Sequence, residues 1–298
     1  MIAALTSAWL ILSAPVGQGF PDNERWREVL HNELAVGLGS EGAAALLDLS
    51  SNRVVVHHNI ESLAQPGRVG SILKLVAAAS LLERYGTENP YRCLGKASIS
   101  GRERVCWHKP GHGIVHLGRA ISESCNLYFH AHAESLHPDD YIATLKAYGF
   151  GRVTGYSDVE VPGQIPAILS RAGLVDAVIG DHRQVVVTGL QVLRFLGILS
   201  GTGPLARAGS VIDARLRESM VEVVEHGTAA PRILDVRLAG KTGTASRYNH
   251  WAYDGWFAGF FPVERPKYAF VFWKRNSTGA RAAAHFQKLL GRSFKGAL

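Results

Sequence analysis

Ser71 and Lys74 are the first residues of this chain whose types and spacing could do chemistry. They are three positions apart in the segment 71–85, which contains no glycine or proline and is rich in leucine and alanine. Residues at that spacing on a helix share a face, so the amine can reach the hydroxyl. A serine hydroxyl becomes a good nucleophile when a base takes its proton, and burial or nearby cations can lower a lysine pKa enough for that role. The pair predicts a nucleophile and its base.

Two more groups follow in the sequence. Ser124-Cys125-Asn126 comes after an apolar-periodic segment, and Lys241-Thr242-Gly243-Thr244 comes at the end of a predicted strand, 237–240. Alone, each is equally typical of a helix-terminal polar cluster or a strand-end turn. The three groups in this order are typical of serine enzymes that react with penicillin. The order, more than any one group, predicts acyl-transfer chemistry.

Several elements must position these groups. The apolar spacing predicts helices over 22–38, 71–85, about 113–148, 185–199 and 280–290. Apolar and β-branched runs predict a hairpin over 42–57 and strands at 236–240, 254–262 and 268–273. Strands at both ends enclose a helical middle. This order predicts an α/β (α+β) fold with an antiparallel sheet built from both chain ends.

From about Gly42 to Leu290 the chain resembles the transpeptidase domain of penicillin-binding proteins. Beyond the three groups, the resemblance rests on matches in order at 117–129, 148–151, 161–163, 178–181, 187–191, 226–229, 239–245 and 255–262. It implies a β-lactamase-like fold in which helices flank the sheet and an all-helical subdomain is inserted. We expect one catalytic domain over 21–298, with a sheet part at about 21–70 and 215–298 and a helical part at about 71–214.

The resemblance also implies roles for the site residues. Ser71 attacks the carbonyl of a D-Ala-D-Ala stem peptide of peptidoglycan, and Lys74 accepts its proton. Ser124 lies between the two lysines and passes a proton to the departing amine. Asn126 orients the acyl donor, and the backbone N–H groups of Ser71 and Thr244 form the oxyanion hole.

The last group, by the same resemblance, binds the end of the peptide. Lys241 and the Thr242 hydroxyl hold its terminal carboxylate, and Lys241 also keeps Lys74 deprotonated. Gly243 lets the strand approach the ligand without a side chain in the way. No cofactor is implied. β-Lactam antibiotics would be covalent inhibitors, and wall-synthesis proteins are expected partners.

The chain departs from the family pattern in three places. Val69-Gly70 stands before the serine where relatives commonly have Pro-Gly. Ile179-Gly180-Asp181-His182 replaces Ile-Gly-Gln-Gly, and Thr188-Gly189-Leu190-Gln191 replaces Thr-Pro-Leu-Gln. A large N-terminal module typical of relatives is not expected within this sequence. These differences predict altered substrate geometry with the chemistry kept.

The N-terminus reads as a targeting segment. No charged residue lies between Ile2 and Phe20, and the apolar part is short for a membrane span but suits a signal peptide. Residues 1–20 are therefore expected to be a signal peptide or an N-terminal anchor, with a buried helix as the alternative. The expected location is extracytoplasmic, in the periplasm or at the outer face of the cytoplasmic membrane.

Three cysteines fit an exported protein without a dense disulfide framework. Cys93 and Cys106 are expected to form a disulfide or to stay as free thiols, and no metal site is expected. The alternative is a zinc site of Cys93, Cys106 and His112, because His108, His112 and His116 lie close in sequence. The spacing matches no standard zinc finger.

The charge distribution and the comparison with related activities narrow the set of possible functions. The net charge is +7 and the pI about 9.4, but basic residues are scattered among acids, which argues against nucleic-acid binding. A D,D-carboxypeptidase, in which water takes the acyl group, is the nearest alternative. A β-lactamase is disfavoured because Asn126 replaces the hydrophobic residue of class D enzymes and no class A glutamate is evident. A non-catalytic β-lactam sensor or scaffold would not need Ser71, Lys74 and Lys241.

Overall fold

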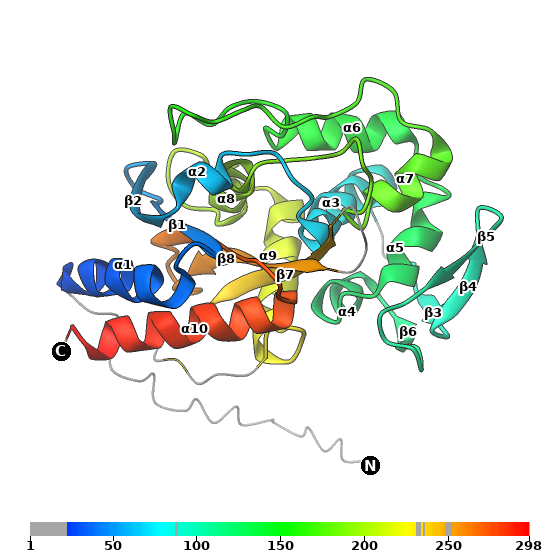
Figure 1. The fold of residues 1–298 in the computed structure, drawn as a ribbon. Helices are drawn as coiled ribbons and strands as arrows, with labels where there is room; N and C mark the ends of the chain where they lie inside the picture. The colour runs from blue at the N-terminus through cyan, green and yellow to red at the C-terminus, as the bar shows by residue number, and fades with distance from the viewer. Residues whose placement is uncertain (1–22, 87–88, 231–233, 235, 248–251, 298) are drawn as a thin grey trace, which may run out of the picture.

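A five-stranded antiparallel sheet forms the centre of the computed structural model, which describes residues 23–86, 89–230, 234, 236–247 and 252–297 (Figure 1). Its strand order is β2-β1-β9-β8-β7, so β7 ends the sheet. The strands are β1 (Gly42–Asp48), β2 (Arg53–His58), β7 (Ala239–Ser246), β8 (Tyr253–Phe261) and β9 (Tyr268–Lys274). The first two come from the N-terminal hairpin and the others from the C-terminal third. The predicted fold class is confirmed.

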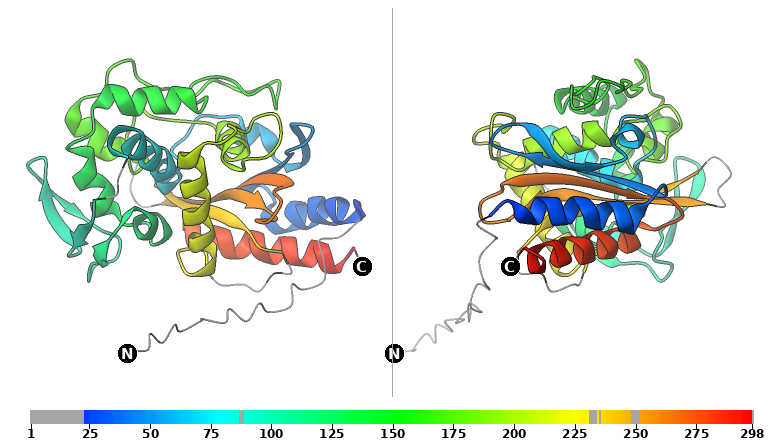
Figure 2. Two further views of the ribbon diagram at one scale, coloured as in Figure 1. Left: turned by 180° about the vertical axis from the view of Figure 1, so that it is seen from behind. Right: turned by 60° about the vertical axis from the view of Figure 1, so that its left-hand side comes forward.

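The sheet is covered on both faces. Helices α1 (Arg25–Leu38) and α10 (Gly279–Lys295) pack side by side on one face (Figure 2, right). The short 3₁₀ helix η1 (Gly70–Leu73), with α3 (Lys74–Tyr85), and α8 (Gly189–Leu199) lie on the other. The alternating side chains of each strand therefore enter two apolar layers.

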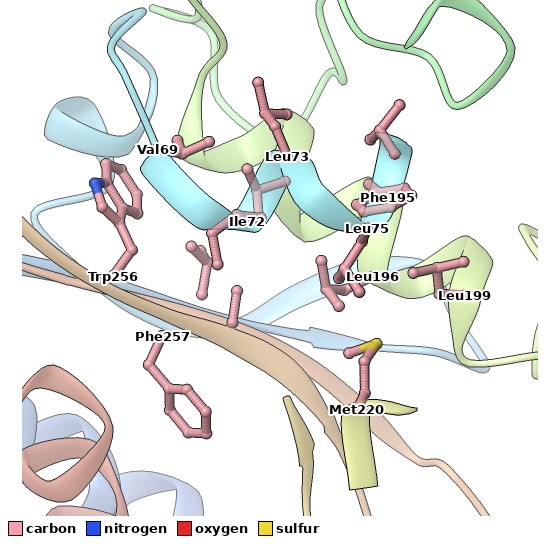
Figure 3. Packing of buried hydrophobic residues seen from close by; sticks show 14 of the residues in the cluster. Val69, Ile72, Leu73, Leu75, Phe195, Leu196, Leu199, Met220, Trp256 and Phe257 are labelled. Atoms are coloured by element: carbon pink, nitrogen blue, oxygen red, sulfur yellow. The ribbon is translucent and has the colours of Figure 1, made fainter. Parts of the chain in front are cut away.

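Neighbouring residues of β8 show this alternation. Phe257 packs against Phe270 and Phe286 on the α10 side, with ring centroids 5.0 and 5.9 Å away. Trp256 points to the opposite side, toward Val69 and Ile72 (Figure 3). Burying one such large apolar side chain contributes about 1.5–3 kcal/mol. The packing under Ile72 holds η1 on the sheet next to β7.

The helical middle is more broken than the sequence predicts. The expected helix over 113–148 is wrong, because the structure has strand β6 (Gly113–Val115) followed by the three separate helices α4 (Leu117–Ser122), α5 (Asn126–Ala133) and α6 (Pro138–Ala147). Ser124 has a φ of +55°, a left-handed conformation that ends α4. Pro138 is the first residue of α6, where its missing N–H costs nothing.

Other helices of this region begin at recognisable caps. The helix expected over 185–199 is α8, and it begins only at Gly189. Thr188 is its N-cap and forms a reciprocal capping box with Gln191. Helix α7 (Arg171–Ala177) begins after Ser170, and α9 (Val211–Glu225) after Ser210; both serines accept a backbone N–H. Helix α2 (Ile60–Leu63) precedes the nucleophile segment.

Two small sheets project from the helical region and were not predicted (Figure 1). Strand β3 (Tyr91–Cys93) pairs with β6, and β4 (Lys96–Ile99) pairs with β5 (Arg102–Val105). Strands of three or four residues give too short an alternation to be recognised in a sequence. They bring Cys93 beside the segment 106–113.

The predicted targeting segment, 1–20, lies outside the described residues. None of the helices in the described ranges combines the length and the apolar character needed to cross a bilayer.

Candidate active site

Ser71 lies one residue into η1, and Lys74 begins α3. The sequence predicts one helix from Ser71; the structure tightens its first turn to a 3₁₀ geometry, in which residues i and i+3 eclipse each other. Gly70 has a φ of +57°, and a Cβ on it would lie 2.5 Å from the Thr244 carbonyl oxygen. Only glycine lets the backbone before Ser71 touch β7 in this way.

Lys74 is fully buried and is held by the Ser124 loop. Its Nζ donates to the Ser124 carbonyl at 2.7 Å, to Ser124 Oγ at 3.2 Å and to Asn126 Oδ1 at 2.6 Å. Burial lowers the pKa of Lys74 to about 7, although the nearby Cys125 and Cys106 oppose the shift. The amine is therefore partly neutral at neutral pH. Within the described residues, the Ser71 hydroxyl has no hydrogen-bond partner.

Ser124 links the two lysines. Lys241 Nζ donates to the same Ser124 Oγ at 3.0 Å and to the Thr242 carbonyl at 3.1 Å. Burial, and next the charge of Lys74, lower the pKa of Lys241 well below its usual value. Two ammonium groups this close in a dry site repel each other. The site therefore favours a state in which one lysine is a charged ammonium and the other a neutral amine, with the Ser124 hydroxyl hydrogen-bonded to both.

The Lys241-Thr242-Gly243 group lies inside β7, which corrects the expected position at a strand end. Gly243 fits against η1 so closely that a Cβ would lie 2.2 Å from the Val69 carbonyl oxygen. Thr244 is exposed, and its Oγ1 accepts the Gly279 N–H at 2.9 Å. Since β7 is an edge strand, its free backbone groups can pair with an extended peptide.

Thr228 is a site residue to which the sequence gave no role. Its hydroxyl lies 2.5 Å from the Thr242 hydroxyl, and it lines a cavity of about 310 Å³ with Trp107, His108, Arg119 and His226. It follows α9, and α9 packs against β7. The segment 226–229 was recognised only as part of the family resemblance, because no local pattern brings Thr228 to Thr242.

Asp181, in a segment that departs from the family pattern, connects the segment before Ser71 with the end of β7. Arg68 Nη1 donates to its carboxylate at 2.9 Å, and Ser246 Oγ donates to the same oxygen at 3.1 Å. A Cβ on the preceding Gly180 would lie 2.0 Å from the Gly70 carbonyl oxygen. The altered segment therefore contacts the backbone just before the nucleophile.

Four buried residues with metal-ligating side chains meet beside the catalytic loop: Cys93, Cys106, His112 and Cys125. Their ligand atoms lie within 4.8 Å of one another. The cysteines are free, so of the two states expected for Cys93 and Cys106 the structure has the free thiols and not the disulfide. The hydrogen bond between the Cys106 and Cys125 sulfurs lowers the pKa of the Cys106 thiol, which favours a thiolate.

The geometry of these four residues fits a zinc ion. His112 Nδ1 lies 3.5 Å from both Cys93 Sγ and Cys106 Sγ, and the Cys106 and Cys125 sulfurs are 4.0 Å apart. A tetrahedral zinc ion with Zn–S of about 2.3 Å and Zn–N of about 2.0–2.1 Å requires S–N edges of roughly 3.5 Å and S–S edges of roughly 3.8 Å. The sequence named three of the four residues and missed Cys125, which was read only as the middle of Ser124-Cys125-Asn126.

The same region supports the catalytic loop directly. Trp107 Nε1 donates to the carbonyls of Glu123 and Ser124 at 3.0 and 3.1 Å. Cys125 is itself flanked by Ser124 and Asn126, the two residues that hold Lys74. Because Ser124 has a positive φ, these contacts stabilise a backbone conformation that a serine rarely adopts.

An antiparallel sheet covered by helices on both faces, with a helical region beside its edge strand, is the fold of the penicillin-recognising serine enzymes. Residues 42–291 match the family described as the penicillin binding protein transpeptidase domain. The chain belongs to this family, and the resemblance inferred from its motifs is confirmed.

Two curated relatives are longer than this chain. It is 28% identical to the peptidoglycan D,D-transpeptidase MrdA of Acinetobacter baumannii over 234 residues, covering 59% of this chain and 34% of MrdA. It is 24% identical to stage V sporulation protein D of Bacillus subtilis over 237 residues, covering 66% of this chain and 36% of that protein. The chain thus spans about a third of the length of these relatives.

Solved structures share the fold at low sequence identity. PBP2 of Helicobacter pylori, in its complex with MreC, superposes with a TM-score of 0.79 at 23% identity, covering 89% of this chain and 62% of that one. PBP2 of Pseudomonas aeruginosa gives a TM-score of 0.76 at 20% identity, covering 90% and 76%.

Proposed function

We propose that this chain is a serine D,D-transpeptidase that cross-links peptidoglycan stem peptides through an acyl ester on Ser71. The observation that carries the proposal is the Ser124 hydroxyl between two fully buried lysines, 3.2 Å from Lys74 Nζ and 3.0 Å from Lys241 Nζ. Buried lysines with lowered pKa values are rare outside functional sites. The name of the relative MrdA supports the same activity.

The first half-reaction uses both sides of the cleft. Ser71 Oγ attacks the carbonyl of the penultimate D-Ala, and its proton goes to the neutral Lys74 amine. The backbone N–H groups of Ser71 and Thr244 stabilise the oxyanion. When the C–N bond breaks, the departing D-Ala amine takes a proton from Ser124, which is resupplied by the lysine pair. The products are free D-Ala and the acyl ester.

Ligand contacts follow from the same arrangement. Lys241 and Thr242, with Thr228 beside it, hold the terminal carboxylate, and the approach of that anion raises the pKa of Lys241 so that the ammonium form dominates. The Asn126 amide orients the donor backbone. In the second half-reaction an acceptor amine attacks the ester and gives a proton to Ser124 and the lysine pair, Ser71 Oγ leaves and takes back its proton from Lys74, and a new peptide bond forms.

Zinc at Cys93, Cys106, His112 and Cys125 is part of the proposal as a structural support. A four-ligand site leaves no open position for chemistry, so the ion would fix the loop that carries Ser124 and Asn126. The chain's own residues perform every step above. The measurement is metal content of the purified protein by mass spectrometry.

Location and partners follow from the substrate. Peptidoglycan lies outside the cytoplasmic membrane, so an enzyme that cross-links it works there, in agreement with the targeting segment expected over 1–20. The H. pylori PBP2 structure is a complex with MreC. We therefore propose wall-synthesis proteins as partners of this chain and β-lactams as its covalent inhibitors.

The test is the intact mass after incubation with benzylpenicillin, for the wild type and for Ser71→Ala. A long-lived adduct in the wild type alone supports acyl-Ser71 chemistry. Rapid turnover would indicate a β-lactamase, and no adduct would indicate a non-catalytic protein. Ligation of a labelled D-amino acid or peptide amine to a D-Ala-D-Ala donor then separates transpeptidation from carboxypeptidation, which gives only the hydrolysed donor.

A further inference from the structure

The direction of a bound donor peptide is fixed by where β7 meets the nucleophile, if the proposed function holds. The terminal carboxylate lies at Thr242, and the reacting carbonyl lies at Ser71 and Thr244. The residues that precede the penultimate D-Ala must then run on past Thr244, along Ala245 and Ser246. At roughly 3.3 Å per residue, Ser246 is about 7 Å beyond Thr244 and so faces the first or second residue upstream.

A cavity of about 410 Å³ opens at that end of β7. Its walls come from the segment that leads to Ser71, the segment after Asp181, and the ends of β7, β8 and β9. The lining residues that matter are Arg68, Arg183, Ser246, Arg247, Trp256 and Trp273. The two tryptophans form its apolar wall, with ring centroids 6.1 Å apart.

Positively charged side chains outnumber negatively charged ones in this cavity. Three arginines line it against one carboxylate, Asp254, to which Arg247 donates at 2.6 Å. Arg68 already forms an ion pair with Asp181, which is not among the lining residues. Arg183 is exposed, and no carboxylate among the described residues lies within ion-pair distance of it.

One polar atom in the apolar wall of the cavity is unpaired within the described residues. Trp256 is only 7% exposed, and its Nε1 finds no hydrogen-bond partner in the described part of the chain. A buried indole N–H normally has an acceptor, because leaving it unpaired costs about 1–3 kcal/mol. Because this N–H has almost no accessible surface, it does not reach into the cavity, and the arginines are the groups there that can contact a ligand.

We propose that this cavity is a subsite for a carboxylate carried by the donor stem peptide one or two residues upstream of its penultimate D-Ala. Arg183 and Arg247 bind the carboxylate, and the planar guanidinium groups suit its geometry. The enzyme then prefers donors with a free carboxylate at that place over donors in which it is a carboxamide. This inference rests on the proposed function, which sets the direction of the donor.

The test compares pairs of synthetic tetrapeptide donors ending in D-Ala-D-Ala, the two members of a pair being identical except that the first or the second residue carries a side-chain carboxylate or the matching carboxamide. In one of the pairs, we expect the wild type to release D-Ala from the acid with a kcat/KM about tenfold higher, equivalent to about 1.4 kcal/mol. The variant Arg183→Gln, at an exposed position, should lose most of this preference. The double variant Arg183→Gln with Arg247→Gln should lose all of it. Arg265→Gln, in the exposed turn between β8 and β9, is the matched control and should keep it.

Acylation by benzylpenicillin separates the two proposals, because the phenylacetamido group that stands in place of the upstream residue carries no carboxylate. The arginine variants should acylate at the wild-type rate, which also shows that they are folded. Equal rates for the two donors of both pairs in a wild type that acylates normally would overturn the subsite alone, as would a preference that persists in the double variant. A wild type that never acylates would overturn the proposed function itself.

Discussion

Ser71 and Lys74 come from one continuous segment, whereas Ser124 lies on a loop between two short helices and Asn126 begins the second of them. The backbone of the first pair is positioned by one 3₁₀ turn, one glycine and an apolar underside packed on the sheet (Figure 3), and the Lys74 amine is held by the Ser124 loop. The loop depends on residues from elsewhere in the chain, the cysteine-histidine cluster and Trp107. Substitutions in distant residues should therefore displace the Ser71 backbone little, whereas changes in the cysteine-histidine cluster or Trp107 should destabilise the Ser124 loop.

Removing the base should give the largest effect. Lys74→Gln leaves the nucleophile in place without a proton acceptor, so acylation by a fluorescent penicillin should slow by about 10²–10⁴-fold. Ser80→Ala is the matched control, because the Ser80 hydroxyl is buried in the same helix and has no hydrogen-bond partner within the described residues. Its acylation rate should stay within about twofold of the wild type. Near wild-type acylation by Lys74→Gln would mean that another group is the base.

Cys93→Ser tests the support of the loop through the cluster, since the hydrogen-bond partner of Cys93 is His112 and not a catalytic residue. We expect the zinc content to fall from one ion to none. If zinc were present at about 100 times its Kd, its loss would remove about 2.7 kcal/mol, or roughly 5–11 °C in Tm. Cys125→Ser should do the same. A metal-free wild type with the Tm of Cys93→Ser would argue against a metal at this site.

Acylation should depend on pH through Lys74. Its folded pKa is about 7, below its usual value, so the amine is protonated and inactive as a base under more acidic conditions. The acylation rate should therefore fall about tenfold for each pH unit below 7 and level off above it. Stopped-flow acylation across pH 5–9 measures this. A rate that keeps rising to pH 10 would show that the amine retains an ordinary pKa.

Trp107→Phe should have the smallest effect. It keeps the ring but removes the N–H that donates to the Glu123 and Ser124 carbonyls. The loss of a hydrogen bond of about 1 kcal/mol would slow acylation about fivefold. His108→Ala, which alters a neighbouring ring outside the metal-ligating cluster, is the control. A change as large as that of Lys74→Gln would mean that Trp107 contacts the substrate.

The same contrast explains what the sequence could predict. Strands β1, β2, β8 and β9 and helix α3 are long enough for their apolar patterns to be read, and the spacing of Ser71 and Lys74 is local. The roles of three other residues depend on contacts with residues far away in sequence, so no short segment predicts them. These residues are Cys125, Thr228 and Trp107. The helix expected over 113–148 failed for a related reason, because the left-handed Ser124 is stabilised by long-range contacts that override helix propensity.

The position of β7 at the sheet edge has a consequence for self-association. An edge strand usually invites the sheet of another molecule to add to it, and proteins block such strands to avoid aggregation. Here η1 lies against β7, with the Val69 carbonyl oxygen too close to Gly243 to admit even a methyl group. This contact covers one face of β7 and leaves its outer edge open to an extended peptide. The covered face narrows what can lie over this edge, so we expect a single peptide strand to fit there more readily than the sheet of a second copy.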